Sequence, residues 1–204
     1  MKLYYAVGTC SMAVHLLLEE IGEPFERHLL RFSAGDQKKP EYLAINPKGK
    51  VPALQTEDGV ITEMPVICHY LAHRFPQARL LPDAFMPRVR AMEMLDYIAA
   101  TVHMRGFSRL ANPAAFSPDG DPHRVSSDGR KFVEDGLGIM EAALGDRPFA
   151  LGQQFSILDA GYFLIEWWAG RREIGLPPAM EAHYERMLTR PAVRRMLADE
   201  DKYR

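Results

Sequence analysis

The sequence has few cysteines for its length. Among its 204 residues only Cys10 and Cys68 are cysteines, which is too few for a disulfide framework. Neither belongs to a run of cysteines and histidines with the spacing of a zinc site. We therefore expect neither a disulfide bridge nor a metal cofactor.

The sequence also lacks an excess of either charge and any long apolar run. It has 25 basic and 27 acidic residues, a net charge of −2, which argues against nucleic acid and anionic membranes as partners. No uninterrupted apolar stretch approaches the roughly 18 residues that cross a bilayer. The N-terminus does not follow the order of a signal peptide. We expect a cytoplasmic protein with no membrane partner.

What the sequence does contain is a hydrophobic fraction of 47%, enough for one large domain or two small ones. The first third changes period repeatedly. It predicts a strand at 1–7, a helix at 11–21 and a second strand at 25–30, which is a βαβ opening. A turn at 46–49 then precedes two short strands, 51–54 and 59–61, whose tight connection predicts an antiparallel hairpin. A helix over 65–75 follows, with proline at its first position.

Strand signals disappear in the rest of the chain. The stretch 78–87 has two prolines and no sustained period, so we interpret it as a linker. Helices are expected at 128–144, 156–170, 178–189 and 191–198, and a further helix carries one apolar stripe, formed by Val89, Met92, Leu95, Ala99 and Val102. The stretch 112–128 is expected to be a long surface loop. The sequence thus predicts an α/β domain over 1–77 and an all-α domain over 88–204.

One helix start in the second domain has a specific signal. Ser156 and Asp159 stand three residues apart before an apolar run, which predicts a capping box. The Ser156 hydroxyl would accept from the Asp159 N–H, and the Asp159 carboxylate would accept from the Ser156 N–H. The run that follows is apolar on nearly all sides, so we expect its helix to be buried in the domain.

Cys10 is the first candidate for chemistry, because it stands where the first strand gives way to the first helix. Unpaired N–H groups and the helix dipole favour a thiolate at such a position, and the usual thiol pKa of about 8.5 can fall there to about 3.5–7.5. The alternative interpretation is a small buried hydrophobic residue, which is what most free cysteines are.

Cys10 is one of several motifs that together resemble a known family. They are the opening Met1-Lys2-Leu3-Tyr4-Tyr5, then Gly8-Thr9-Cys10-Ser11 with His15, Ala44-Ile45-Asn46-Pro47-Lys48-Gly49, Val51-Pro52-Ala53-Leu54, Thr62-Glu63, and Phe155-Ser156-Ile157-Leu158-Asp159-Ala160. In this combination the chain resembles the cytosolic glutathione transferases, and within them the bacterial beta class. The likeness covers nearly the whole chain. It implies a thioredoxin-like N-terminal domain, an all-helical C-terminal domain, and a homodimer that binds glutathione near its interface.

The resemblance also implies roles for individual residues. Val51-Pro52 would be a cis peptide bond, although sequence alone favours trans, and Val51 would pair with the peptide backbone of glutathione. Glu63 would accept from the γ-glutamyl ammonium, while the amides at the start of the next helix hold the γ-glutamyl carboxylate. Met64 stands where many relatives have serine, so its N–H can bind that carboxylate but its side chain cannot. Loss of such a bond would weaken glutathione binding roughly tenfold to a hundredfold.

Two further glutathione contacts are predicted in the helical domain. Seven residues make nearly two α-helical turns, so Asp96 and His103 are expected on one face, with Ala99 and Ala100 leaving an open strip between them. In the beta class the matching residues face the glutathione site, and Asp96 would reach the ligand of the neighbouring subunit. His15 and Cys68 are interpreted as structural.

Three functions are compatible with this set of residues. The first is transfer of glutathione to small hydrophobic electrophiles, a detoxification activity, with possible thiol–disulfide exchange. In it Cys10 would act either as nucleophile or as host to the glutathione sulfur, and His103 as polariser or proton carrier. The second is glutathione-dependent isomerisation or dehalogenation of aromatic compounds, and the third is glutathione binding without catalysis. An electrophile pocket could be lined by Phe107, Arg109, Phe116 and Trp168.

Overall fold

The computed structural model describes residues 1–203, and they divide into two compact units. Unit 1 contains Met1–Leu80 together with the chain from Leu188 onward, and unit 2 contains Leu81–Met187. Our expected boundaries placed the C-terminal end of the chain in the helical domain, whereas here it packs with the N-terminal one. In the part of the chain that is described, no helix is both long and apolar enough to cross a membrane.

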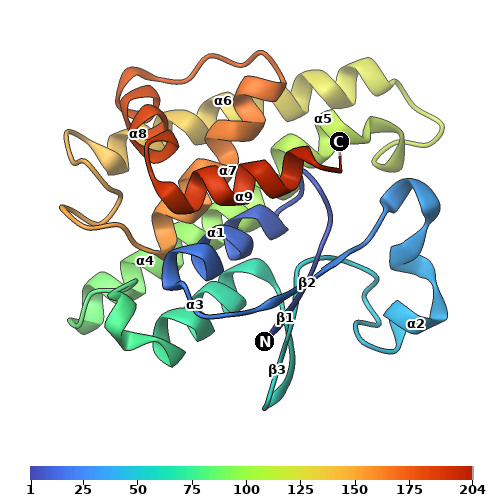
Figure 1. Ribbon diagram of the computed structural model, residues 1–204. Helices are drawn as coiled ribbons and strands as arrows, with labels where there is room; N and C mark the ends of the chain where they lie inside the picture. Colours follow the sequence, from blue (N-terminus) through green and yellow to red (C-terminus); the bar gives the residue numbers. More distant parts are fainter. Residues whose placement is uncertain (204) are drawn as a thin grey trace. The chain divides into compact units, whose positions relative to one another are not determined.

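Unit 1 is built on a four-stranded mixed sheet (Figure 1). Its strands are β1 (Lys2–Tyr5), β2 (Glu26–Leu29), β3 (Ala53–Thr56) and β4 (Gly59–Thr62), in the order β2-β1-β3-β4. β1 and β2 are parallel and are joined through helix α1 (Ser11–Ile21), while β3 and β4 form an antiparallel hairpin. The predicted βαβ opening and hairpin are therefore confirmed.

Alternation along the strands gives the sheet two covered faces. Leu3 and Tyr5 are buried on the face that α1 covers together with α3 (Met64–Arg74). Tyr4 and Ala53 belong to a second cluster on the other face, with Tyr42 of the short helix α2 (Pro40–Leu43). Before α2, the polar stretch forms two short 3₁₀ helices, η1 (Phe32–Ala34) and η2 (Asp36–Lys38), and a third, η3 (Pro76–Ala78), follows α3.

The C-terminal helix α9 (Pro191–Asp201) packs against α1, which explains why it belongs to unit 1 (Figure 1). Arg190 donates to both carboxylate oxygens of Glu20 at 2.6 and 2.9 Å, and Arg195 donates to Glu19 at 2.6 Å. The apolar side of α9 is buried at Ala192, Val193 and Met196. Sequence spacing could not reveal these contacts, because each joins residues about 170 positions apart.

Unit 2 consists of helices. They are α4 (Phe85–Tyr97), the π-helix η4 (Ile98–Phe107), α5 (Ser108–Ala111), the 3₁₀ helix η5 (Pro113–Ala115), α6 (Pro122–Leu144), α7 (Ile157–Arg171) and α8 (Pro178–Leu188). The long loop expected at 112–128 is shorter than predicted, because α6 begins at Pro122 and is capped by Asp121, which accepts from the His123 N–H at 2.8 Å. Pro122 occupies the first turn, where its missing N–H costs nothing.

The π-helix is the feature that the apolar stripe did not predict. The stripe from Val89 to Val102 was interpreted as one α-helix, but α-helical bonding stops at Tyr97. Helix α6 approaches η4 closely, since a Cβ added at Gly106 would lie 2.7 Å from Val133 and one added at Gly136 would lie 2.7 Å from Val102. Glycine is required at both positions for the two helices to pack in this way.

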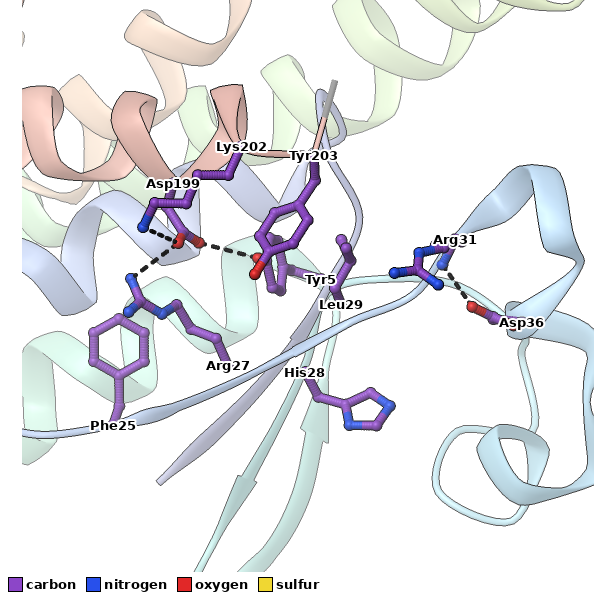
Figure 2. A pocket seen from close by; sticks show the side chains of 10 residues that line it. All are labelled: Tyr5, Phe25, Arg27, His28, Leu29, Arg31, Asp36, Asp199, Lys202 and Tyr203. Atoms are coloured by element: carbon purple, nitrogen blue, oxygen red, sulfur yellow. Dashed lines mark hydrogen bonds and ion pairs between the residues drawn. The ribbon is translucent and has the colours of Figure 1, made fainter.

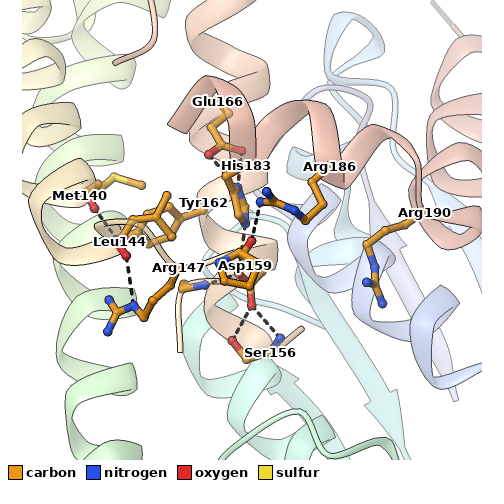
Figure 3. A network of polar contacts seen from close by, with 12 residues as sticks. Met140, Leu144, Arg147, Ser156, Asp159, Tyr162, Glu166, His183, Arg186 and Arg190 are labelled. Carbon is orange, nitrogen blue, oxygen red and sulfur yellow. Dashed lines mark hydrogen bonds and ion pairs between the residues drawn. The ribbon is translucent and has the colours of Figure 1, made fainter. Parts of the chain in front are cut away.

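The predicted capping box is present at the start of α7 and is part of a buried polar network (Figure 3). One oxygen of the Asp159 carboxylate accepts from the N–H and the hydroxyl of Ser156, both at 2.7 Å. The other accepts from the Ala150 N–H at 2.6 Å and lies 3.0 Å from Nε2 of His183, whose Nδ1 lies 2.8 Å from Glu166. Burial alone would lower the pKa of His183, but its bonds to the two carboxylates raise it to about 9.

Candidate functional site

Cys10 lies at the N-cap of α1, at the end of a turn that follows β1. Gly8 in this turn has a φ of 70°, a conformation that glycine adopts without steric cost. The Thr9 hydroxyl donates to the Ala6 carbonyl at 2.8 Å, and the Thr9 carbonyl accepts from the Met12 N–H at 3.0 Å. The turn and the first helical turn are thereby fixed on either side of the half-buried thiol.

The Cys10 thiol faces the segment before β3. Its Sγ donates to the Val51 carbonyl at 3.2 Å, and the Val51–Pro52 peptide bond is cis, as the resemblance implies. Burial raises the pKa of Cys10 to about 12; a backbone hydrogen bond at Cys10 acts against this shift, Glu63 adds to it, and Lys50 opposes it. Of the two interpretations of Cys10, the pKa agrees with the buried one, because loss of hydration outweighs the effect of the helix start.

The segment that carries Val51 is held by hydrogen bonds to the preceding backbone. The Lys50 carbonyl accepts from the Tyr42 hydroxyl at 2.5 Å and from the side-chain amide of the buried Asn46 at 2.7 Å. Gly49 has a φ of 60°, and a Cβ there would lie 2.9 Å from the Gln37 carbonyl oxygen. The predicted turn at 46–49 thus places Val51 outside the strand ladder, whose pairing with β1 begins at Ala53.

Glu63 is the N-cap residue of α3 and has a φ of 72°, which is unusual for a residue other than glycine. Such backbone outliers are concentrated at functional sites. The Glu63 carboxylate accepts from Lys48 Nζ at 2.6 Å, and the same ammonium donates to the Thr62 hydroxyl at 2.8 Å. The Met64 side chain is buried, so it offers this surface only its N–H.

Two residues at this site were not proposed from the sequence. Lys48 was seen only as part of a turn, although its charge next to Glu63 is a signal that could have been used. Glu200 of α9 is buried and accepts from the Gly8 N–H at 2.7 Å, so it holds the turn that precedes Cys10. No local signal could reveal Glu200, because it lies 192 positions from Gly8 in the sequence.

Asp96 and His103, the predicted contacts in unit 2, lie on either side of the change from α- to π-helix. Asp96 is exposed in α4, and His103 is half-buried in η4. The i→i+5 bonding of a π-helix adds about one residue to each turn, so the α-helical spacing that placed them on one face does not apply. His103 packs against Trp168, with ring centroids 4.8 Å apart.

The residues proposed for an electrophile pocket form two pairs within unit 2. Phe107 packs against Trp168 with ring centroids 5.3 Å apart, so Trp168 contacts both Phe107 and His103. The Arg109 guanidinium lies 4.9 Å from the centroid of the Phe116 ring. The structure therefore joins His103, Phe107 and Trp168 in one aromatic cluster and keeps the Arg109–Phe116 pair as a separate contact.

The residues interpreted as structural are fully buried. His15 packs edge-on against the rings of Tyr5 and Phe25, and Cys68 lies in α3. Burial raises the pKa of the Cys68 thiol. Among the residues that the structure describes, no group of three or more His, Cys, Asp or Glu side chains could hold a metal ion.

A thioredoxin-like sheet with a cysteine at its first helix start and a cis-proline before β3, followed by a helical unit, is the architecture of the glutathione transferases. The family model for the N-terminal domain of glutathione S-transferases matches residues 8–74. Glutathione S-transferase GstA of Escherichia coli O157:H7 is 36% identical, over 98% of each chain. This chain belongs to the glutathione S-transferase family.

Solved structures agree with this assignment. A sphingomonad glutathione S-transferase in complex with glutathione is 28% identical over 98% of this chain and 99% of its own, with a TM-score of 0.86. A beta-class enzyme from Sphingomonas chungbukensis is 30% identical over 98% of both chains, with a TM-score of 0.83. The resemblance to bacterial beta-class enzymes and the predicted fold class are thus confirmed.

Proposed function

We propose that this protein transfers glutathione to small hydrophobic electrophiles and that Cys10 serves as a hydrogen-bond donor to the glutathione sulfur. The observation that carries the proposal is the Cys10 thiol, which already donates to Val51 at 3.2 Å and has a pKa raised by burial. A neutral thiol is a poor nucleophile. It can, however, donate to a thiolate that another molecule brings, and two thiolates side by side would repel each other.

In this mechanism the glutathione thiolate is the nucleophile. Its sulfur forms a bond to an electrophilic carbon, and the electron pair of the broken bond departs with the leaving group. Cys10 and the first amides of α1 stabilise the thiolate before attack, which makes glutathione more acidic at this site. Thiol–disulfide exchange through Cys10 would instead require ionisation of Cys10, which burial opposes.

The ion pair between Lys48 and Glu63 supports a site for the γ-glutamyl end of glutathione. That end carries an ammonium and a carboxylate. The ammonium would bind Glu63, and the carboxylate would bind Lys48 and the N–H groups of Met64 and Val66, since Pro65 has none. One exposed ion pair in the free protein would be exchanged for two, so that little is lost on binding.

The remaining predicted roles complete the proposal. Val51 and Pro52 would contact the peptide backbone of glutathione, and Asp96 and His103 would be further glutathione contacts in a homodimer. The cluster of Phe107 and Trp168 would take the electrophile, with Arg109 and Phe116 at its margin. Isomerisation and dehalogenation of aromatic compounds use the same glutathione contacts, so the choice among them depends on the substrate.

Substitutions of Cys10 test the mechanism. Cys10→Ser keeps a donor, so we expect its conjugation rate to stay within a few-fold of the wild type, whereas Cys10→Ala should lose about tenfold to a hundredfold, the effect of one hydrogen bond to a charged group. Rates with chlorinated aromatics and with cis-enone acids, each with and without glutathione, give the readout. Cys68→Ala is the matched control and should retain activity.

Three outcomes would contradict the proposal. Full conjugation by Cys10→Ala would show that the thiol is no conjugation catalyst. Loss of activity in Cys10→Ser together with disulfide reduction by the wild type would identify Cys10 as a nucleophile. Binding to immobilised glutathione without turnover of any substrate would indicate a non-catalytic protein.

A further inference from the structure

A cavity of about 620 Å³ lies along the free edge of β2 (Figure 2), and none of its lining residues is one proposed to bind glutathione. β2 is one of the two edge strands of the sheet. The floor is formed by Tyr5 and Leu29, which are paired across β1 and β2, and the end of α9 forms one side. The volume is in the range of small-molecule sites. All of its lining residues belong to unit 1.

The cavity contains three cationic side chains and two acidic ones, and the two acids are already supplied with donors. Asp199 accepts from the Tyr5 hydroxyl at 3.0 Å. Asp36 accepts from the Arg31 N–H at 2.8 Å and from Lys39 at 2.5 Å, and the bond from Lys39 holds the pKa of Asp36 below its usual range. Both carboxylates therefore already accept hydrogen bonds from within the protein, which leaves them little capacity to bind a cation.

The cationic side chains of the cavity, in contrast, have only distant acidic partners. The Arg27 guanidinium lies 3.7 Å from Glu19 and 3.6 Å from Asp199, beyond ordinary hydrogen-bond length. Each of those acids has a closer partner, Arg195 for Glu19 and Tyr5 for Asp199. Lys202 reaches Asp199 only at 3.5 Å. The Arg31 guanidinium acts on Asp36 through its charge, as one of the smaller causes of the lowered pKa of that carboxyl, whose close cationic partner is Lys39 at 2.5 Å.

The strand edge adds backbone donors to this surface. Glu26 and Leu30 donate their N–H groups to β1, to the carbonyls of Met1 and Tyr5 at 2.9 and 2.8 Å. Because alternate residues of a strand face opposite edges, the N–H groups of Arg27 and Leu29 face away from the sheet. The carbonyl groups of Arg27 and Leu29 face the same edge, so the backbone offers both donors and acceptors there, and the excess of donors comes from the cationic side chains.

We infer that this cavity is a second binding site, which takes a small dicarboxylate between Arg27 and Arg31. The two guanidiniums lie on opposite sides of Tyr5 and Leu29 in Figure 2. Arg27 is in β2 and Arg31 lies two residues beyond its end, so their Cα atoms are at most about 13 Å apart along an extended chain. Planar guanidinium groups match carboxylates in a two-point geometry. Two separated cations suit a ligand with charge at both ends, and Lys202 and Tyr203 close the side formed by α9.

The test is calorimetric titration of the full chain with adipate at low ionic strength. Hexanoate, which has the same carbon chain and one charge, is the control ligand. We expect saturable binding of adipate at one site and at least fivefold weaker binding of hexanoate. Arg31→Gln and Lys202→Gln, both at exposed side chains, should each weaken adipate about fivefold or more, since each removes a charged donor.

Arg124→Gln provides the matched control, because Arg124 is an exposed arginine of unit 2. Its affinity for adipate should equal that of the wild type. All variants should conjugate glutathione at the wild-type rate, which separates this inference from the proposed function. The inference is overturned if adipate does not saturate, if Arg31→Gln and Arg124→Gln bind alike, or if inorganic phosphate binds more tightly than adipate.

Discussion

At the scale of single residues, burial determines the protonation of the groups around β1 and α1. Cys10 and His15 both lie in the first turns after β1, and the helix start alone would favour a thiolate and leave the histidine unaffected. Burial instead raises the pKa of Cys10 to about 12 and lowers the pKa of His15 to about 4. Both side chains are thereby kept neutral at pH 7, and the donor role proposed for Cys10 depends on this neutral state.

Because His15 is neutral in the folded protein, the free energy of unfolding decreases as the pH falls. Its ring lies among the side chains of Tyr5, Phe25, Glu19, Asp199 and Arg27, and its nitrogens have no hydrogen-bond partner in the described chain. The pKa of His15 is lower in the folded protein than in the unfolded chain. Its contribution to the free energy of unfolding is therefore present above about pH 6.5 and is lost as the pH falls toward 4. The full loss is about 3 kcal/mol.

We expect His15→Leu to remove this dependence. Urea unfolding at pH 7.5 and pH 4 should show that the wild type loses about 3 kcal/mol more than the variant between the two conditions. His123→Leu, at an exposed histidine of α6, is the control and should follow the wild type. Equal losses in His15→Leu and the wild type would show that His15 is not the group responsible.

At the scale of elements, the Asp159 carboxylate both caps helix α7 and binds buried groups outside the cap. The Asp159 carboxylate is fully buried. It accepts from the Ala150 N–H and from the N–H and hydroxyl of Ser156, and it faces the ring of His183. Ser156→Ala removes only the hydroxyl and should cost about 1 kcal/mol. Asp159→Ala leaves several buried donors without an acceptor and should cost about 3–5 kcal/mol.

Chemical denaturation of these variants gives the comparison. Asp121→Ala, at the exposed cap of α6, is the reference for an ordinary N-cap and should lose about 1 kcal/mol. The interpretation of Asp159 as the centre of the network fails if Asp159→Ala is no more destabilised than Asp121→Ala.

Elements with local signals could be predicted from the sequence, and elements set by packing could not. The capping box, the hairpin and the strand–helix start at Cys10 each depend on residues a few positions apart. The π-helix η4 has no such signal, because its wider turn is accommodated by Gly106 and Gly136 against side chains of another helix. For the same reason the α-helical spacing used for Asp96 and His103 does not apply across η4, while the set Cys10, Val51 and Glu63 could be proposed from motifs.

At the scale of the whole molecule, the C-terminal end of the chain belongs to unit 1, the unit in which the chain begins. Asp199 and Glu200 are buried and bind the Tyr5 hydroxyl and the Gly8 N–H, at the two ends of the segment that leads to Cys10. Unit 1 is therefore completed only when the last helix is in place. A fragment with the sequence boundaries 1–77 should lack part of its own core.

Truncation tests this dependence. A chain that ends at Thr189 exposes the apolar face that Ala192, Val193 and Met196 cover, and should lose roughly 4–6 kcal/mol, a large part of the 5–15 kcal/mol typical of a folded protein. A chain that ends at Asp201 keeps α9 and is the control. Urea unfolding followed by circular dichroism should show a much lower midpoint, and weaker retention on immobilised glutathione, only for the shorter chain. If the two truncated chains unfold at the same midpoint, α9 is not part of the folding unit that holds Cys10.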